Sequence, residues 1–257
     1  MSTLFHHLVF GPVQSRRLGV SLGVNLLPPD GKYCNFDCIY CECGWNRDGK
    51  SRSKLPGRAE IRAALMQKLA EMQTTGSIPD SITFAGNGEP TVHPQFPAIV
   101  DDVIELRNRY APSAKISVLS NATMLHHADV IAALQKTDRP ILKMDSGIAS
   151  TIARINRPAA DISVPELIAR LQSFEGQCII QTMFVHGTCD GKPVDNTTPE
   201  ELDAWEQAVL AIRPKQLMIY TIDRDTPANT LRKASSQTLH KIARRMEKFG
   251  LQVQVAI

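Results

Sequence analysis

The sequence of 257 residues lacks the features that mark several whole classes of protein. No run approaches the roughly 18–20 consecutive apolar residues that a membrane helix requires, so we expect no membrane span. Aromatic residues are scarce at 5%, and 29 basic residues nearly balance 26 acidic ones. The resulting net charge of +3 does not by itself indicate nucleic-acid binding. The composition is that of a globular protein and excludes the disordered, collagenous and disulfide-scaffold classes.

The N-terminal residues also lack the charged segment, apolar core and cleavage site of a secretory signal. We therefore expect a cytoplasmic protein whose thiols stay reduced. Four of the six cysteines nevertheless lie within ten residues, at Cys34, Cys38, Cys41 and Cys43. Clustered thiols in a reducing compartment bind metal or perform redox chemistry more often than they pair. A disulfide framework is the less favoured alternative, because a chain of this length buries a large core without cross-links.

Apolar runs typical of strands alternate along the chain with segments typical of helices. The predicted strands cover residues 20–27, 81–85, 116–119, 141–145, 178–185 and 216–222. The predicted helices cover residues 58–73, 94–110, 126–135, 164–174, 199–212 and 237–249. Six strand-plus-helix units predict a parallel sheet with right-handed crossovers, either as an incomplete barrel or as an open doubly wound sheet.

No shift in composition marks a domain boundary, so we predict a single domain over residues 1–257. Its core covers residues 18–225, and a C-terminal helix and tail cover residues 236–257. Two stretches, 28–54 and 187–198, show neither pattern. Irregular stretches of that length in a compact domain are usually functional.

Cys34, Cys38 and Cys41 are spaced C-x3-C-x2-C and follow directly on the first predicted strand. The C-terminal ends of strands are where parallel α/β folds place their chemistry. Three thiolates from one loop can each bind one iron of a cubane cluster and leave the fourth iron open to a ligand. Cys43 as a fourth ligand would instead make the protein an electron carrier. We favour a thiol that binds no iron there, because Cys41 and Cys43 are only two residues apart.

The segment Cys38-Ile-Tyr40-Cys41, preceded by Cys34, resembles the cluster-binding signature of the radical S-adenosylmethionine (SAM) enzymes. That superfamily also has a Gly-Gly-Glu-Pro type of turn after the second strand, and this chain has Gly86-Asn-Gly-Glu-Pro90 at that place. The resemblance implies an α/β fold, an incomplete (βα)6 TIM-type barrel of parallel strands with N-terminal and C-terminal extensions.

The resemblance further implies two cofactors, a [4Fe-4S] cluster and SAM, with Cys34, Cys38 and Cys41 as metal ligands and catalytic residues. In that superfamily the reduced cluster cleaves SAM to methionine and a 5′-deoxyadenosyl radical, which takes hydrogen from a substrate. We therefore expect a radical SAM enzyme with an unidentified substrate. An electron donor such as flavodoxin or ferredoxin is the implied partner, and we expect the protein to be a monomer.

Further SAM contacts are predicted at the turn and at the ends of the third and fourth strands. Gly86 and Gly88 permit positive φ and close backbone approach, although a plain turn is the alternative. Asn121 lies at a strand end, where a helix cap is the alternative. The predicted cofactor-binding residues are Tyr40, Gly86, Asn87, Gly88, Glu89, Ser120, Asn121, Lys143 and Asp145.

Alternation along the fourth strand places Lys143 and Asp145 on one face. Such a pair on a central strand is costly unless the charges pair or face a polar cavity. We expect both side chains to point into the barrel, where they bind the ribose or carboxylate of the cofactor. A structural ion pair is the alternative.

Segments 10–19, 143–146 and 155–158 resemble the subgroup related to the tRNA wyosine-synthesis enzymes. Those enzymes carry further N-terminal cysteines for a second cluster, whereas Cys34 is the only cysteine before Cys38 here. They also use a catalytic lysine, which this chain offers only by position, at Lys143. We therefore favour a smaller substrate, with a tRNA-modifying enzyme, a glycyl-radical activase and a non-enzymatic electron carrier as alternatives.

Basic residues follow the cysteine loop and recur in the last predicted helix. We favour solvated faces over nucleic-acid binding for them, because charge runs usually face solvent. A radical intermediate must be shielded from water, so residues 47–54 and 187–198 are expected to form a lid that orders on substrate binding. The basic residues are Arg47, Lys50, Arg52, Lys54, Arg58, Arg62, Lys241, Arg244, Arg245 and Lys248.

Replacing Cys34, Cys38 or Cys41 singly with Ala should abolish the absorbance of the cluster, because each thiolate binds its own iron. The matched variant Cys43→Ala should keep that absorbance. Ultraviolet–visible spectra and iron analysis after anaerobic reconstitution measure both results. Loss of the cluster in Cys43→Ala would contradict the three-ligand assignment.

Overall fold

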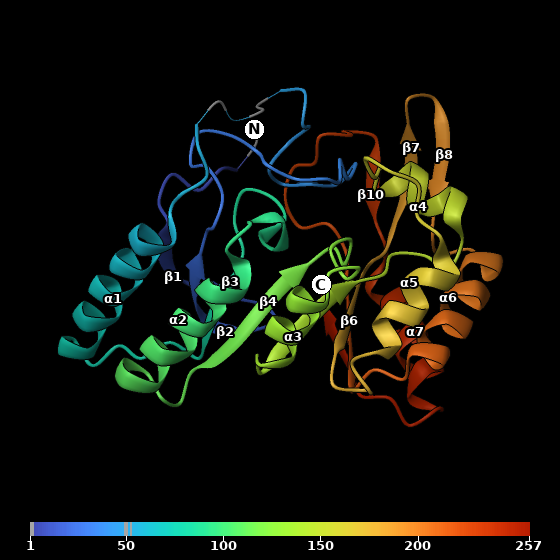
Figure 1. Cartoon of the computed structure of the whole chain (residues 1–257). Coiled ribbons are helices and arrows are strands. Elements are labelled where there is room, and N and C mark those ends of the chain that lie inside the picture. Colours follow the sequence, from blue (N-terminus) through green and yellow to red (C-terminus); the bar gives the residue numbers. More distant parts are fainter. Residues whose placement is uncertain (1–2, 49–50, 52) are drawn as a thin grey trace. The chain divides into compact units, whose positions relative to one another are not determined.

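The computed structural model describes residues 3–48, 51 and 53–257, and its elements follow one another as α/β units (Figure 1). The strands are β1 Val9–Ser15, β2 Gly19–Val24, β3 Ser81–Phe84, β4 Lys115–Ser120, β5 Arg139–Lys143, β6 Ile179–Met183, β7 Val185–Cys189, β8 Lys192–Asp195, β9 Gln216–Tyr220, β10 Leu231–Lys233 and β11 Val253–Ala256. The helices are α1 Arg58–Thr74, the 3₁₀ helix η1 Pro90–Val92, α2 Phe96–Tyr110, α3 Ala128–Gln135, α4 Ala149–Ile155, α5 Val164–Gln172, α6 Pro199–Ile212 and α7 Ser236–Glu247.

The chain packs as two compact units, which are described separately. The first unit comprises residues 4–34 and 49–140, and the second comprises residues 1–3, 35–48 and 141–257. The boundary therefore falls inside the cysteine loop, with Cys34 in the first unit and Cys38 and Cys41 in the second. The prediction of a single domain stays a prediction.

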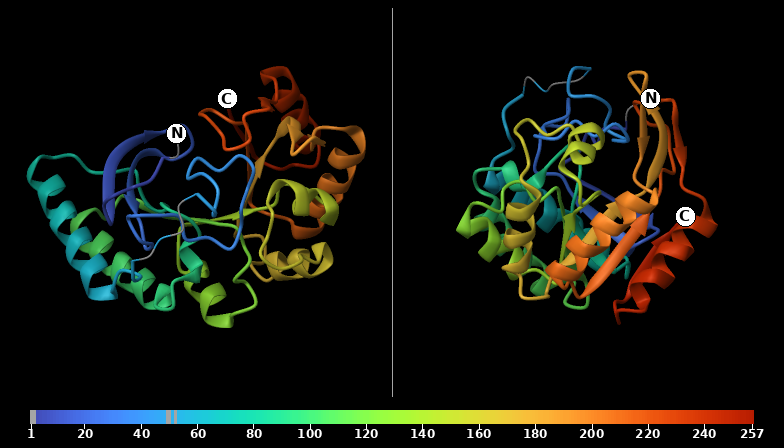
Figure 2. Two further views of the ribbon diagram at one scale, coloured as in Figure 1. Left: turned by 90° about the horizontal axis from the view of Figure 1, so that it is seen from above. Right: turned by 90° about the vertical axis from the view of Figure 1, so that its right-hand side faces the viewer.

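In the first unit, strands β1 to β4 lie in sequence order. β2, β3 and β4 are parallel, and β1 is antiparallel to β2. Helices α1 and α2 lie side by side along the strands (Figure 2). Helix α1 packs through Ile61, Leu65, Leu69 and Met72, a spacing that places apolar side chains on one face of a helix.

In the second unit, β5, β6, β9 and β11 form parallel pairs in that order. A separate sheet of β10, β7 and β8 is antiparallel. Helix α6 begins at Pro199, and the side chain of its N-cap Thr198 accepts a hydrogen bond from the backbone of Glu201. Trp205 of α6 is buried against Phe184 and donates to the hydroxyl of Thr182, which fixes the helix on β6.

All six predicted strands and all six predicted helices are present, with shifts of up to a few residues at their ends. The prediction of an irregular stretch at 187–198 was wrong, because these residues form most of the β7–β8 hairpin. Asp190 and Gly191 both have positive φ, which the two-residue turn of such a hairpin requires. Strands β1, β10 and β11 and helix α4 were not predicted. Strands β10 and β11 are short and pair with distant residues, and α4 has only seven residues. Strand β1 pairs with its neighbour β2, but Gly11 and Pro12 interrupt its apolar pattern.

Asp102 of α2 joins the two helices of the first unit, since Arg58 and Arg62 of α1 both donate to it at 2.6–3.0 Å. Hydrogen bonds from Arg58 lower the pKa of Asp102 below its usual value. A lowered pKa stabilises the folded protein above about pH 4, and this contribution is lost as pH falls through the folded-state pKa.

We expect Asp102→Asn to lower the free energy of unfolding by about 1–2 kcal/mol at pH 7, because three charge-assisted hydrogen bonds weaken. The deficit should shrink at pH 3, where the wild-type carboxyl is itself being protonated. Urea unfolding followed by circular dichroism at both pH values measures it. The neighbouring Asp101→Asn, an exposed residue paired only with Lys136, is the control. An equal deficit at both pH values would contradict the role of the charge.

Candidate functional site

The cysteine loop of the second unit, residues 35–48, is anchored through its backbone. Ile39 donates to the carbonyl of Ile155 at 2.9 Å, and Asp37 donates to the carbonyls of Asn156 and Arg157 at 3.0 and 3.1 Å. Within the loop, the amide of Cys41 donates to the carbonyl of Cys38 at 3.0 Å. These backbone bonds attach the loop to the end of α4 and the residues that follow it.

Cys38 is 7% exposed, and Asn156 donates its side-chain amide to the sulfur at 3.5 Å. Burial raises the pKa of this thiol to about 11. A thiol must lose its proton to bind a metal, so this sulfur becomes a ligand when a cation replaces the proton. Amide donors to ligand sulfurs are among the contacts that tune iron–sulfur clusters. The donor set around Cys38 therefore fits an iron–sulfur ligand.

Four donors in the first unit converge on the carboxylate of Glu89. They are the hydroxyls of Thr91 and Ser120 and the backbone amides of Thr91 and Asn121. Glu89 is buried, and that burial raises its pKa despite these hydrogen bonds. The carboxylate thus ties the turn after β3 to the end of β4, and three predicted site residues meet here.

The turn after β3 also pairs with the residue before Cys34. Tyr33 donates to the carbonyl of Asn87 at 2.7 Å and accepts from the amide of Glu89 at 3.2 Å. A side chain at Gly88 would overlap the carbonyl of Tyr33, so only glycine fits at this contact. Cys34 itself has the side-chain amide of Asn121 3.9 Å from its sulfur. The first unit therefore brings Cys34, Asn121 and the turn together.

The side chain of Asn87 is occupied by the protein. It accepts from the amide of Phe5 and donates to the carbonyls of Phe5 and Pro28, at 2.8–2.9 Å. This residue is fully buried and fastens the N-terminal segment to the turn. Contact with the cofactor stays a prediction for Asn87, and its side-chain amide already has these partners.

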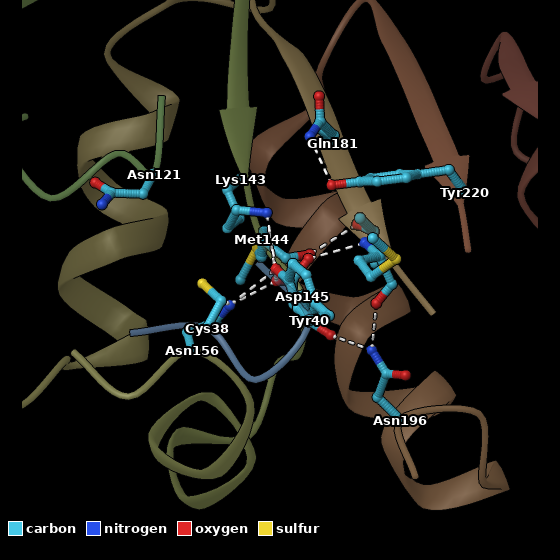
Figure 3. Close-up of polar contacts among 12 residues, drawn as sticks. Cys38, Tyr40, Asn121, Lys143, Met144, Asp145, Asn156, Gln181, Asn196 and Tyr220 are labelled. Carbon is cyan, nitrogen blue, oxygen red and sulfur yellow. Dashed lines mark hydrogen bonds and ion pairs between the residues drawn. The ribbon is translucent and has the colours of Figure 1, made fainter. Parts of the chain in front are cut away.

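Polar side chains of the second unit meet at the carboxylate of Asp145, as Figure 3 shows. Tyr40 donates its hydroxyl to this carboxylate, and Asn156 donates to it at 2.6 Å. The other carboxylate oxygen accepts from the amide of Met183 at 2.8 Å. Asp145 is 2% exposed, so these donors replace the water that a buried carboxylate lacks.

Lys143 joins the same network, which confirms that it lies on one side with Asp145. Its ammonium is 2.8 Å from the hydroxyl of Tyr40 and 3.6 Å from Asp145. Burial is the largest influence and works against the charge, but Asp145, Tyr220 and Cys38 together raise the pKa of Lys143. The ion pair and this shift both favour the ammonium form of Lys143. Lys143 and Asp145 form the ion pair that was the alternative interpretation. Contact with the cofactor stays a prediction for both residues.

Two asparagines of this site were not predicted. Asn156 donates to Cys38, Tyr40 and Asp145 at once. Asn196 donates to the carbonyls of Asp145 and Met183 at 2.9 and 2.8 Å and is fully buried. Asn156 follows α4 and Asn196 follows the β7–β8 hairpin, two elements that were not predicted. Predicting those elements would have placed both asparagines at the end of an element.

Some of the predicted basic residues have structural partners in the described part of the chain. Arg58 and Arg62 pair with Asp102, and Arg245 pairs with Glu206 and Asp203 at 2.5 Å. Lys50 and Arg52 lie outside the described residues. These pairings favour the solvated-face interpretation for the cations that they include.

The described residues contain no group of three or more His, Cys, Asp or Glu side chains arranged to hold a metal ion. A [4Fe-4S] cluster has a different geometry, because each of its cysteines binds a separate iron. Among the helices of residues 3–48, 51 and 53–257, none is long and apolar enough to span a membrane.

The model of the Radical SAM superfamily matches residues 29–195, and the chain belongs to this superfamily. It is accordingly an enzyme, and its cofactors are a [4Fe-4S] cluster and SAM. Among curated proteins, a UPF0026 protein of Synechocystis sp. is 30% identical over 236 residues, which cover 88% of this chain and 79% of that protein. A protein of Brachyspira hyodysenteriae named GTPase Obg is 25% identical over 93% of this chain. The chain spans only 33% of that relative and 58% of a Helicobacter pylori UPF0026 protein.

Solved structures show the fold. A radical SAM methyltransferase from Sphaerobacter thermophilus has a TM-score of 0.68 at 14% identity, over 92% of this chain and 65% of that one. TYW1 with a lysine–pyruvate adduct has a TM-score of 0.59 at 12% identity, over 89% of this chain and 73% of that one. SuiB from Streptococcus suis bound to SAM has a TM-score of 0.62 at 12% identity, over 91% of this chain and 50% of that one. The fold is the expected incomplete TIM-type barrel.

Asn156→Ala should weaken the site without unfolding the second unit, because it removes one amide shared by the sulfur of Cys38 and the side chains of Tyr40 and Asp145. Loss of such a supporting contact typically lowers metal affinity or activity about 10- to 100-fold. Iron retention under a chelator, compared in Asn156→Ala and in Asn229→Ala on an exposed loop, measures the effect. Equal retention in the two variants would refute the role of Asn156.

Proposed function

We propose that Cys34, Cys38 and Cys41 hold one [4Fe-4S] cluster whose open iron binds SAM. The single observation that carries the proposal is the contact of Asn156 with both the buried sulfur of Cys38 and the Tyr40–Asp145 network. This contact joins the motif loop to polar side chains near the end of β5, where a parallel α/β fold binds its ligands.

The bound cluster would supply one-electron chemistry. An electron passed from it to SAM would release methionine and a 5′-deoxyadenosyl radical able to take a hydrogen atom from a substrate. A small protein of the flavodoxin or ferredoxin class supplies that electron in this proposal, and the cytoplasm is its setting. The family affiliation supports the proposal.

In this proposal the residues of the chain bind SAM and orient it. Gly88 brings the backbone of the turn close to Tyr33 and Cys34, and Glu89 holds the turn against the end of β4. The backbone groups of this turn are our candidates for contact with the amino group of SAM. Lys143 is a cation at the end of β5 and is our candidate for a carboxylate, which an ammonium binds as a point charge.

The ion pair with Asp145 also bears on a second role for Lys143, that of a nucleophile toward a carbonyl substrate. The neighbour TYW1 was solved with a lysine–pyruvate adduct. An amine attacks a carbonyl in its neutral form, and the ion pair with Asp145 favours the ammonium form of Lys143. A radical SAM reaction on a different substrate, with Lys143 as a binding residue, is therefore the favoured form of the proposal.

Reduced, reconstituted protein should convert SAM to 5′-deoxyadenosine, which liquid chromatography quantifies against methionine. Cys38→Ala should abolish this product, and Cys43→Ala should retain it within about twofold, since a thiol that binds no iron leaves the cluster unchanged. An electron carrier would accept dithionite electrons and yield no 5′-deoxyadenosine. That result would overturn the proposal.

A further inference from the structure

A cavity of the second unit lies between α4 and the β7–β8 hairpin. Its volume is about 200 Å³, and the residues that line it include Arg154, Arg157, Cys189, Asp190 and Lys192. We call it the hairpin pocket. Whole-ligand sites typically measure about 300–1,000 Å³, so this cavity suits one group of a ligand rather than an entire molecule.

Positive charge dominates the wall of the hairpin pocket. Arg157 pairs with Asp190 at 2.5 Å. Arg154 donates only to neutral oxygens, the carbonyl of Ser150 at 3.3 Å and the hydroxyl of Thr151 at 3.1 Å. In the described part of the chain, neither Arg154 nor Lys192 has a carboxylate at ion-pair distance. Three cations and one carboxylate leave the pocket with a charge of +2.

The central cation of the pocket is held in place before any ligand arrives. Arg157 has φ +47°, in the left-handed region that side chains disfavour, and it precedes a proline. Its guanidinium lies 4.8 Å from the centre of the Trp45 ring and donates to the sulfur of Cys189 at 3.1 Å. Backbone strain of this kind persists only where surrounding contacts impose it, and it gathers at functional sites.

We propose that the hairpin pocket binds the dianionic phosphate group of a phosphate monoester. Two guanidinium groups present N–H donors in a planar fork that matches phosphate oxygens, and Lys192 adds a point charge. A monoester carries about −1.5 to −2 at pH 7, which matches the charge of the pocket. A carboxylate or a nucleic-acid phosphodiester carries only one negative charge and leaves one cation unpaired.

The pocket is a different site from the proposed SAM site, and its occupation needs no radical chemistry. The two are joined through the chain itself, because Asn156 contacts Cys38 and the next residue, Arg157, lines the pocket. Asp37 of the cysteine loop donates to the backbone carbonyls of both residues. A phosphate bound by Arg157 therefore contacts the turn that supports the loop.

Isothermal titration of the full-length, cluster-loaded protein with phenyl phosphate tests the proposal, with methyl phenyl phosphate as the matched diester. We expect the monoester to bind with a Kd below about 1 mM and at least tenfold more tightly than the diester. Arg154→Gln and Lys192→Gln should each weaken monoester binding about tenfold, and Asp190→Asn should strengthen it, because it removes the competing carboxylate. Arg244→Gln, an exposed cation on α7, should change nothing.

No heat of binding, or equal affinity in the wild type and in both Gln variants of Arg154 and Lys192, would overturn the proposal. Equal or tighter binding of the diester, or of a 12-nucleotide RNA, would also overturn it and assign the pocket to a phosphodiester backbone. Thermal unfolding of each variant checks that the fold is retained. The titration measures binding and does not require SAM cleavage. A preparation that does not cleave SAM can therefore still test phosphate binding.

Discussion

The carboxylate of Asp145 is the constraint on which the second unit depends. A buried carboxylate without donors would cost several kcal/mol, so the fold must bring donors to it. Those donors come from three places far apart in sequence: Tyr40 of the cysteine loop, Asn156 after α4, and the amide of Met183 at the end of β6. Satisfying one charge thus positions the loop, the turn and the strand end together.

The first unit solves the same problem with Glu89. Its four donors come from the turn that it begins and from the end of β4, so the turn and the strand end are mutually oriented. Each unit therefore has a buried carboxylate beside a strand end, and each carboxylate organises the segment that carries motif residues. Glu89 and Asp145 therefore each have a structural role apart from any contact with a cofactor.

Regular periodicity made the strands and helices of the βα units predictable, and alternation along β5 correctly placed Lys143 beside Asp145. The β7–β8 hairpin was missed although Asp190-Gly191 is a common turn sequence, because β7 is short and carries His186, Gly187 and Thr188 in place of an apolar run. Asn156 was missed for a different reason. Its three partners lie in two other segments, the cysteine loop and the residues after β5, and no local pattern records a contact between residues 118 positions apart.

The anchoring of residues 35–48 has a consequence for substitutions outside the cysteine motif. The backbone of Ile39 donates to Ile155 and accepts from Ala228. Asp37 donates to the carbonyls of Asn156 and Arg157. None of these bonds uses a cysteine side chain, so replacing a cysteine leaves the backbone anchors of the loop in place. A change in α4 that moves Ile155, by contrast, reaches the loop directly through its backbone.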